Sequence, residues 1–206
     1  MCNENITIQK IYDESLAISN GKGFVAPLGI KENGEIEYVD FSKINNLLVC
    51  GTTGSGKTTF VRTLLTSLML TNTPKNFKLM IFDSRYVDYT DLNGVPFLLI
   101  PVVTDSRKCS GMIGWALGEA QARQRLLMDN TNNMDTFPDI FLVLDDFAEI
   151  SQDPEAQEYL FKLLQIDRRF KIHTIIVTST AVAKIISTEL NQCNFAEGIQ
   201  HGGNSR

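Results

Sequence analysis

Eight consecutive residues carry the clearest chemical signal in the chain. They read Gly51-Thr52-Thr53-Gly54-Ser55-Gly56-Lys57-Thr58 and match the pattern G-x-x-x-x-G-K-[ST]. Glycines let backbone N–H groups turn inward and approach an anion with no Cβ in the way. The apolar run before the loop and the helical pattern after it are the context this motif requires. The spacing therefore predicts a loop that holds the phosphates of a nucleoside triphosphate, most simply ATP.

Two side chains of this loop have separate predicted roles. Lys57 should reach the β- and γ-phosphates, and the Thr58 hydroxyl should be a ligand of Mg²⁺. The helix that begins at Lys57 adds unpaired N–H groups and the positive end of its dipole. ATP and Mg²⁺ are thus the expected cofactors. The predicted nucleotide-binding residues are Gly51, Thr52, Thr53, Gly54, Ser55, Gly56, Lys57, Thr58 and Thr59.

A second acidic site follows the apolar run Phe141–Leu144. Such a strand is expected to lie beside the strand that leads into the phosphate loop, and its terminal acid, Asp145, to hold Mg²⁺ through water. Asp146 is the candidate acid that orients or deprotonates the attacking water, which makes Asp146 and Lys57 the predicted catalytic residues. A simpler interpretation also stands, in which the two acids only end the strand and start the turn Phe147–Ile150.

Short apolar runs rich in β-branched residues alternate with helical patterns along the chain. This alternation predicts an α/β fold with a mostly parallel sheet and helices on both faces. A turn signal at Glu32-Asn33-Gly34 predicts a short N-terminal hairpin within 24–42. The expected strands are Asn46–Cys50, Lys78–Phe82, Phe97–Val103, Ile140–Leu144 and His173–Thr178, and the expected helices are about 57–70, 106–128, 154–170 and 181–190.

The chain is long enough for one α/β domain with a real core. We expect a lead-in over 1–23 that packs on the domain edge, the nucleotide-binding domain over 24–190, and a loose tail over 191–206.

Composition bears on which classes of protein and which cellular compartment are compatible with the chain. The net charge of -5 gives no whole-chain sign of a nucleic-acid binder, although a ring can concentrate a few basic side chains in a pore. Four scattered cysteines and two histidines argue against a structural metal or a disulfide framework. No apolar run reaches the roughly 20 residues that span a bilayer. The sequence therefore predicts a cytoplasmic domain, with any membrane association supplied by segments outside this chain.

Beyond the phosphate loop, further motifs carry a family resemblance. The chain resembles the motor domain of the FtsK/SpoIIIE family of DNA-pumping ATPases and, more loosely, the ATPase domains of type VII secretion. The resemblance implies a RecA-like P-loop NTPase. The matching pieces are Leu28-Gly29 with Gly34, Leu47 to Thr58, Gly94 to Leu98, Pro101 to Asp105, Trp115 with Glu119, Asp145 to Glu149, and Ile172 to Ile175.

The chain also departs from the family pattern. Asp83-Ser84-Arg85 stands where the family has Asp-Pro-Lys, and Asp146 replaces a glutamate, which shortens the acid by about 1.5 Å. Thr178, the candidate sensor residue, matches, but Ser179 replaces the glutamine that would sense the γ-phosphate. The elements that follow residue 190 are expected to be reduced. The nucleotide site looks kept and the translocation machinery diminished.

Two functions follow from the resemblance. The first is an ATPase that acts on double-stranded DNA or in mobile-element transfer, assembled as a homo-oligomeric ring, with a membrane-anchored partner or parent chain. The second is an ATP-binding module with weak hydrolysis that serves a partner protein, which Asp146 and Ser179 motivate. Arg168 and Arg169 could act on a neighbour's γ-phosphate in a ring, although a solvated basic helix end is the simpler interpretation. His173 is expected to be a packed residue.

Overall fold

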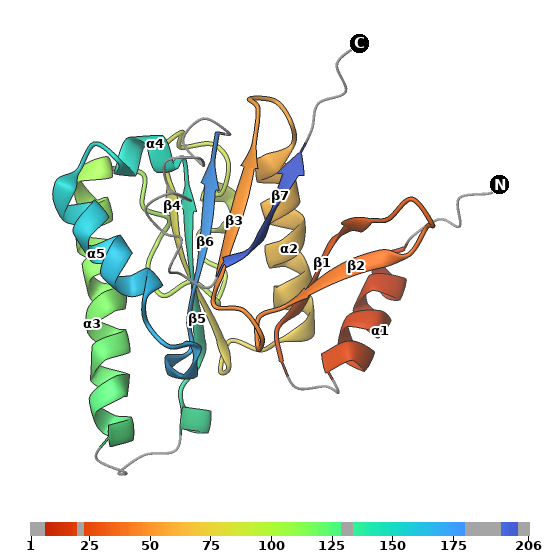
Figure 1. Cartoon of the computed structure of the whole chain (residues 1–206), viewed down its shortest axis with the longest axis horizontal. Helices are drawn as coiled ribbons and strands as arrows, with labels where there is room; N and C mark the ends of the chain where they lie inside the picture. Colours follow the sequence, from red (N-terminus) through yellow and green to blue (C-terminus); the bar gives the residue numbers. More distant parts are fainter. Residues whose placement is uncertain (1–6, 20–22, 129–133, 180–194, 202–206) are drawn as a thin grey trace.

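The computed structural model describes residues 7–19, 23–128 and 134–179, and the backbone of 195–201. Figure 1 shows a central five-stranded sheet with helices on both faces and, at one side, a separate two-stranded hairpin with its own helix. Within the described ranges, no helix combines the length and hydrophobicity needed to cross a membrane.

The central sheet has the strand order β4-β5-β6-β3-β7, and every neighbouring pair is parallel. Parallel strands fit the predicted alternation of strands and helices, because each crossover needs a long connection. Four of these strands lie where the sequence predicted them, and the fifth was not expected. The strands are β3 (Asn46–Gly51), β4 (Phe77–Asp83), β5 (Asp139–Asp145), β6 (Ile172–Thr178) and β7 (Phe195–His201).

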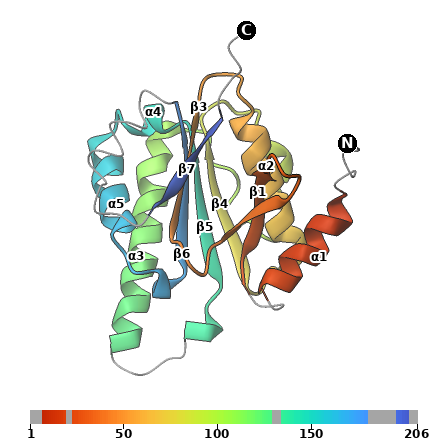
Figure 2. The same ribbon diagram turned by 45° about the vertical axis from the view of Figure 1, so that its right-hand side comes forward.

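The two faces of the sheet bury different helices. Alternate residues of a strand point to opposite faces, so Leu47 and Val49 pack towards α2 (Lys57–Thr71), whereas Leu48 packs on the other side. That other face is covered by α3 (Cys109–Met128), the short α4 (Phe147–Ile150) and α5 (Pro154–Leu164). Figures 1 and 2 show these two layers from different sides. The predicted α/β architecture is confirmed.

The predicted N-terminal hairpin is also confirmed. Strands β1 (Val25–Ile30) and β2 (Ile36–Asp40) pair antiparallel, and Gly34 turns the chain between them with φ 85°. In the lead-in, for which no helix was predicted, Ile8–Ser19 forms helix α1 beside the hairpin and α2. Its apolar residues recur at helical spacing, a signal that a mixed polar composition obscures.

Three other expected elements differ from the structure. Residues 97–103 run beside β4 with only two isolated bridges, because Pro101 has no N–H to donate to a ladder. The helix predicted for 154–170 ends at Leu164, and Asp167 then caps a separate 3₁₀ turn, Arg168–Phe170. The tail predicted to be loose contains β7, which extends the sheet beside β3. The helix predicted for 181–190 lies outside the described residues.

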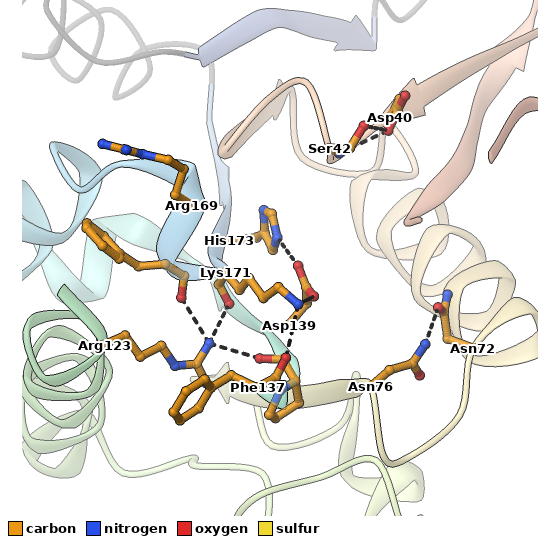
Figure 3. Close-up of polar contacts among 12 residues, drawn as sticks. Asp40, Ser42, Asn72, Asn76, Arg123, Phe137, Asp139, Arg169, Lys171 and His173 are labelled. Atoms are coloured by element: carbon orange, nitrogen blue, oxygen red, sulfur yellow. Dashed lines mark hydrogen bonds and ion pairs between the residues drawn. The ribbon is translucent and has the colours of Figure 1, made fainter. Parts of the chain in front are cut away.

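A buried arginine ties α3 to the edge of the sheet where the strands begin. The Arg123 side chain is 1% exposed, and its Nη1 donates to the carbonyls of Pro138 and Phe170 at 2.9 Å and of Lys171 at 3.3 Å. Its Nε donates to Glu119 at 2.8 Å. Figure 3 shows the guanidinium group with the carbonyls that it binds. One side chain thus satisfies backbone groups of two connections at once.

The neighbouring charges at this amino edge are also paired. The Asp139 carboxylate lies 2.9 Å from His173 Nε2 and 3.6 Å from Lys171 Nζ (Figure 3). The His173 ring is buried and stacks on Phe141, with 4.5 Å between ring centroids. His173 therefore occupies a packed site, as the sequence predicted.

Candidate nucleotide-binding site

The phosphate loop connects the end of β3 to the start of α2, at the carboxyl edge of the sheet. Gly54 and Gly56 have φ of 78° and 87°, a left-handed conformation that favours glycine. A Cβ placed on either residue would meet nothing within 4 Å, so the space in front of both is open. Both glycines thus adopt a conformation that suits a phosphate loop, and the binding of phosphates by the loop amides stays a prediction.

Two side chains of the loop carry polar groups that could bind an anion. Lys57 Nζ donates to the carbonyls of Gly51 and Thr52, each at 2.9 Å, and forms no ion pair with any described residue. The Ser55 hydroxyl is buried and has no hydrogen-bond partner among the described residues. An ammonium group without a counter-ion and an unpaired hydroxyl fit a phosphate chain bound along this loop.

The two predicted metal ligands meet at this edge. The Thr58 hydroxyl donates to Asp145 Oδ2 at 3.3 Å. The strands were expected to be neighbours, and that expectation is wrong, because β6 lies between β3 and β5. The contact still forms because Thr58 lies on the first turn of α2, which begins at the same edge of the sheet where β5 ends. Hydroxyl and carboxylate oxygens are ligands that Mg²⁺ prefers.

The Asp145 carboxyl is 6% exposed, and its environment favours the neutral acid. Burial raises its pKa, and the charge of Asp88 adds to that effect, while the hydrogen bond from Thr58 opposes it. The hydroxyl of Tyr89 is buried close by without a hydrogen bond of normal geometry, and burial and the Asp145 charge raise the pKa of that phenol. A buried carboxylate that forms no ion pair with a described residue is suited to receive a metal ion.

Asp146 adopts an uncommon backbone conformation. Its φ is 74°, in the left-handed region, which costs a non-glycine residue about 1–2 kcal/mol. Its side chain does not cap α4, and it accepts a hydrogen bond from Ser84 Oγ at 3.4 Å. Its carbonyl accepts the N–H of Glu149 at 3.2 Å, so Asp146 does start the helical turn, and both interpretations of this residue stand. Its catalytic role stays a prediction, motivated by strain at the edge that carries the loop.

A third acid at this edge, Asp83, holds the loop after β4 in place, a role that the sequence analysis did not predict. Asp83 ends β4 opposite Asp145 and accepts backbone N–H groups from Arg85 at 3.1 Å, Asp88 at 2.9 Å and Tyr89 at 3.0 Å. These bonds fix the loop that brings Tyr89 beside Asp145. A signal was present, because Asp83 follows a buried apolar strand just as Asp145 does. The role of Tyr89 could not be read from the sequence, since it depends on the path of this loop.

Thr178 also lies at the carboxyl edge. It ends β6 and pairs in register with Cys50, the residue directly before the phosphate loop. Its hydroxyl is buried and has no partner among the described residues. The predicted sensor residue is therefore placed beside the loop, and its role stays a prediction. Ser179 follows it and is exposed.

Arg168 and Arg169 lie at the opposite edge, before β6 begins. Arg168 Nη1 donates to the carbonyl of Lys43 at 2.8 Å, and Arg169 pairs with Asp167 at 2.9 Å. The structure thus does not bring them to the phosphate loop of their own chain. Action on a neighbouring subunit stays a prediction.

The parallel sheet, the glycine loop at the start of α2 and the Thr58–Asp145 pair define the class of protein, a P-loop ATPase domain. Within that class the family is shown by direct comparison. The model of the FtsK/SpoIIIE family matches residues 10–188, and the chain belongs to this family.

Several relatives support this assignment. The chain is 30% identical over 200 residues to a DNA translocase FtsK of Caldanaerobacter subterraneus subsp. tengcongensis, covering 90% of this chain and 28% of the relative. It is 30% identical over 191 residues to a DNA translocase FtsK of Clostridium acetobutylicum, covering 84% and 25%. The chain therefore spans about a quarter of the length of these relatives.

Solved structures show the same fold. ATPases 2 and 3 of Thermomonospora curvata EccC, in complex with a signal sequence peptide, match with a TM-score of 0.70 and 23% identity over 83% of this chain and 32% of that one. The pCW3 conjugation coupling protein TcpA, in a monomer form with ATPγS, matches with a TM-score of 0.65 and 20% identity, covering 84% and 53%. At these identities the likeness concerns the fold.

Proposed function

We propose that this domain binds and hydrolyses Mg-ATP and that it couples the reaction to the movement of double-stranded DNA. The observation that carries the proposal is the contact between the Thr58 hydroxyl and Asp145 beside an open glycine loop. Family membership supports DNA as the substrate, since the matched relatives are DNA translocases.

Each residue has one task in this proposal. The amides of the loop and the Lys57 ammonium bind the triphosphate, while Thr58 and Asp145 hold Mg²⁺, which neutralises charge on the transferring phosphoryl group. Asp146 orients the attacking water or accepts its proton. Thr178, whose hydroxyl has no partner among the described residues, contacts the γ-phosphate.

The assembly belongs to the same proposal. DNA-pumping relatives suggest a homo-oligomeric ring, in which the domain works in the cytoplasm and is linked to the membrane by a partner or by segments outside this chain. In a ring, Arg168 or Arg169 reaches the γ-phosphate of the neighbouring subunit. Native mass measurements with and without a slowly hydrolysed ATP analogue test whether nucleotide drives this assembly.

The decisive experiment measures ATP hydrolysis with and without duplex DNA, in the wild type and in Asp146→Glu. A motor shows turnover that rises with DNA. The longer Glu side chain should bring the carboxylate within reach of the water, so Asp146→Glu is expected to hydrolyse ATP faster than the wild type.

Each result separates the two functions suggested by the sequence. Tight Mg-ATP binding with negligible turnover, no effect of DNA and no gain in Asp146→Glu contradicts the motor proposal and identifies a binding module. If DNA stimulates turnover but Asp146→Glu leaves it unchanged, the catalytic role of Asp146 is wrong while the motor function stands.

A further inference from the structure

The loop of residues 84–89 leaves the end of β4 at the carboxyl edge of the sheet. Strands β4 and β5 are parallel neighbours, and their last residues, Asp83 and Asp145, pair in register. Ser84 and Asp146 are therefore the first residues beyond the paired strands, and they leave the sheet at the same level. This register places a hydroxyl group next to the acid that is the candidate for activating water.

The Ser84 side chain contacts that acid directly. Its hydroxyl donates to Asp146 Oδ2 at 3.4 Å, and both side chains are half-buried. No described residue donates a hydrogen bond to the other carboxylate oxygen, Oδ1. A hydroxyl that holds one oxygen leaves the second oxygen available to accept a hydrogen bond or a proton from water. The bond is long, as catalytic hydrogen bonds often are before a substrate binds.

Asp146 has no other side-chain support among the described residues. A carboxylate at a helix start usually accepts N–H groups of the first turn, but the Asp146 side chain does not cap α4. Without the Ser84 hydroxyl, nothing in the described part of the chain would prevent the carboxylate from rotating about its side-chain torsions. The orientation of this acid therefore depends on one hydrogen bond.

The start of the loop is fixed, so the Ser84 hydroxyl has a defined position. The Asp83 carboxylate accepts the backbone N–H groups of Arg85, Asp88 and Tyr89. Three hydrogen bonds to a single carboxylate leave the backbone of this short loop little freedom. Ser84 lies between the acid and the residues that it binds.

The far side of the loop is tied to α2. Arg62 forms a bidentate ion pair with Asp91, at 2.8 Å from Nη1 to Oδ1 and 2.6 Å from Nη2 to Oδ2. Its Nη1 also donates to the carbonyl of Asp88. Because α2 begins at the phosphate loop, the segment that carries Ser84 is held by the same helix that carries Lys57 and Thr58.

We propose that Ser84 is a positioning residue, whose hydroxyl holds the Asp146 carboxylate in the orientation that acts on the attacking water. The inference rests on the proposed function, because it requires Asp146 to orient the water or accept its proton. It gives the loop after β4 a part in the hydrolysis step rather than in the binding of the nucleotide.

The test separates hydrolysis from binding. Ser84→Ala should lower kcat about tenfold, the effect of losing one hydrogen bond to a charged group, and leave KM and the calorimetric affinity for Mg-ATP unchanged. Ser84→Thr keeps a hydroxyl and should keep most of the wild-type kcat. Ser84→Val has the shape of threonine without the hydroxyl and should lose as much as Ser84→Ala.

Thr90→Ala is the matched control from the same segment. The Thr90 hydroxyl also donates at 3.4 Å, but to the carbonyl of Tyr86 within the loop. Its removal should therefore leave kcat unchanged. Melting temperatures of all the variants are compared with the wild type to confirm an intact fold.

The outcomes separate this inference from the function on which it rests. A wild-type protein that binds Mg-ATP without hydrolysing it refutes the proposed function, and this inference with it. If the wild type hydrolyses ATP and both Ser84→Ala and Ser84→Val keep its kcat, the positioning role is overturned while the function stands. Equal losses in Ser84→Thr and Ser84→Val, or in Thr90→Ala and Ser84→Ala, also overturn it, because the hydroxyl of Ser84 would then not be the cause.

Discussion

The two edges of the central sheet differ in whether their charged side chains form ion pairs with described residues. At the amino edge, Arg123 and Asp139 lie within ion-pairing distance of partners of opposite charge, and Arg123 also binds three carbonyls. At the carboxyl edge, neither Lys57 nor Asp145 forms an ion pair with any described residue.

This difference indicates that the charges at the amino edge stabilise the fold, whereas those at the carboxyl edge are left to bind a ligand or metal ion. A buried charge without a partner destabilises a fold, so it persists where a ligand or metal completes the site. The positive φ of Asp146 at the carboxyl edge is a second such cost. Neutralising a charge should therefore destabilise the protein at one edge and stabilise it at the other.

The largest effect is expected at the amino edge. Arg123→Met should lower the free energy of unfolding by about 3 kcal/mol, because it leaves three carbonyls and Glu119 without their buried donor. Urea unfolding measures this change. Arg125→Met, on the exposed side of the same helix, is the control and should change little. If the two substitutions lower the free energy of unfolding equally, the buried contacts of Arg123 do not contribute the predicted stability.

At the carboxyl edge, Asp145→Asn should have two effects. Because burial raises the pKa of this carboxyl, ionisation opposes folding at neutral pH, so the amide should raise the melting temperature. The same change should also lower the affinity for Mg²⁺, measured in the presence of ATP, by roughly 10–100-fold. Thermal unfolding and titrations at varied Mg²⁺ measure the two. A lower melting temperature would contradict the comparison of the edges.

The smallest predicted effect is a pH dependence of the rise in melting temperature expected for Asp145→Asn. The folded pKa of Asp145 lies above the ordinary 3.8, so its penalty is present at neutral pH and disappears as the carboxyl is protonated. The difference in melting temperature between Asp145→Asn and the wild type should therefore shrink as the pH is lowered from 7. A difference that stays constant over this range would show that ionisation is not its cause.

Local signals were sufficient for most of the fold and for the core of the site. The glycine loop, the apolar strands and the acids at their ends are encoded by neighbouring residues, so β3, α2, Asp145 and Thr178 were all predicted close to their observed places. The hairpin was likewise marked by its turn residues.

What the sequence could not supply depends on contacts between distant segments. The order of the strands places β6 between β3 and β5, and no local pattern records that order. Arg123 reads as a surface residue until α3 is packed against the start of β5 and β6. The strand at 195–201 became visible only through its pairing with β3.

The central claim is that the loop between β3 and α2 binds a magnesium nucleotide, and calorimetry tests it directly. Titration of Mg-ATP into the wild-type protein should give saturable heat for one site per chain, and Lys57→Ala, checked for an unchanged fold, should give none. No saturable heat with the wild type, or an unchanged titration with Lys57→Ala, would contradict it.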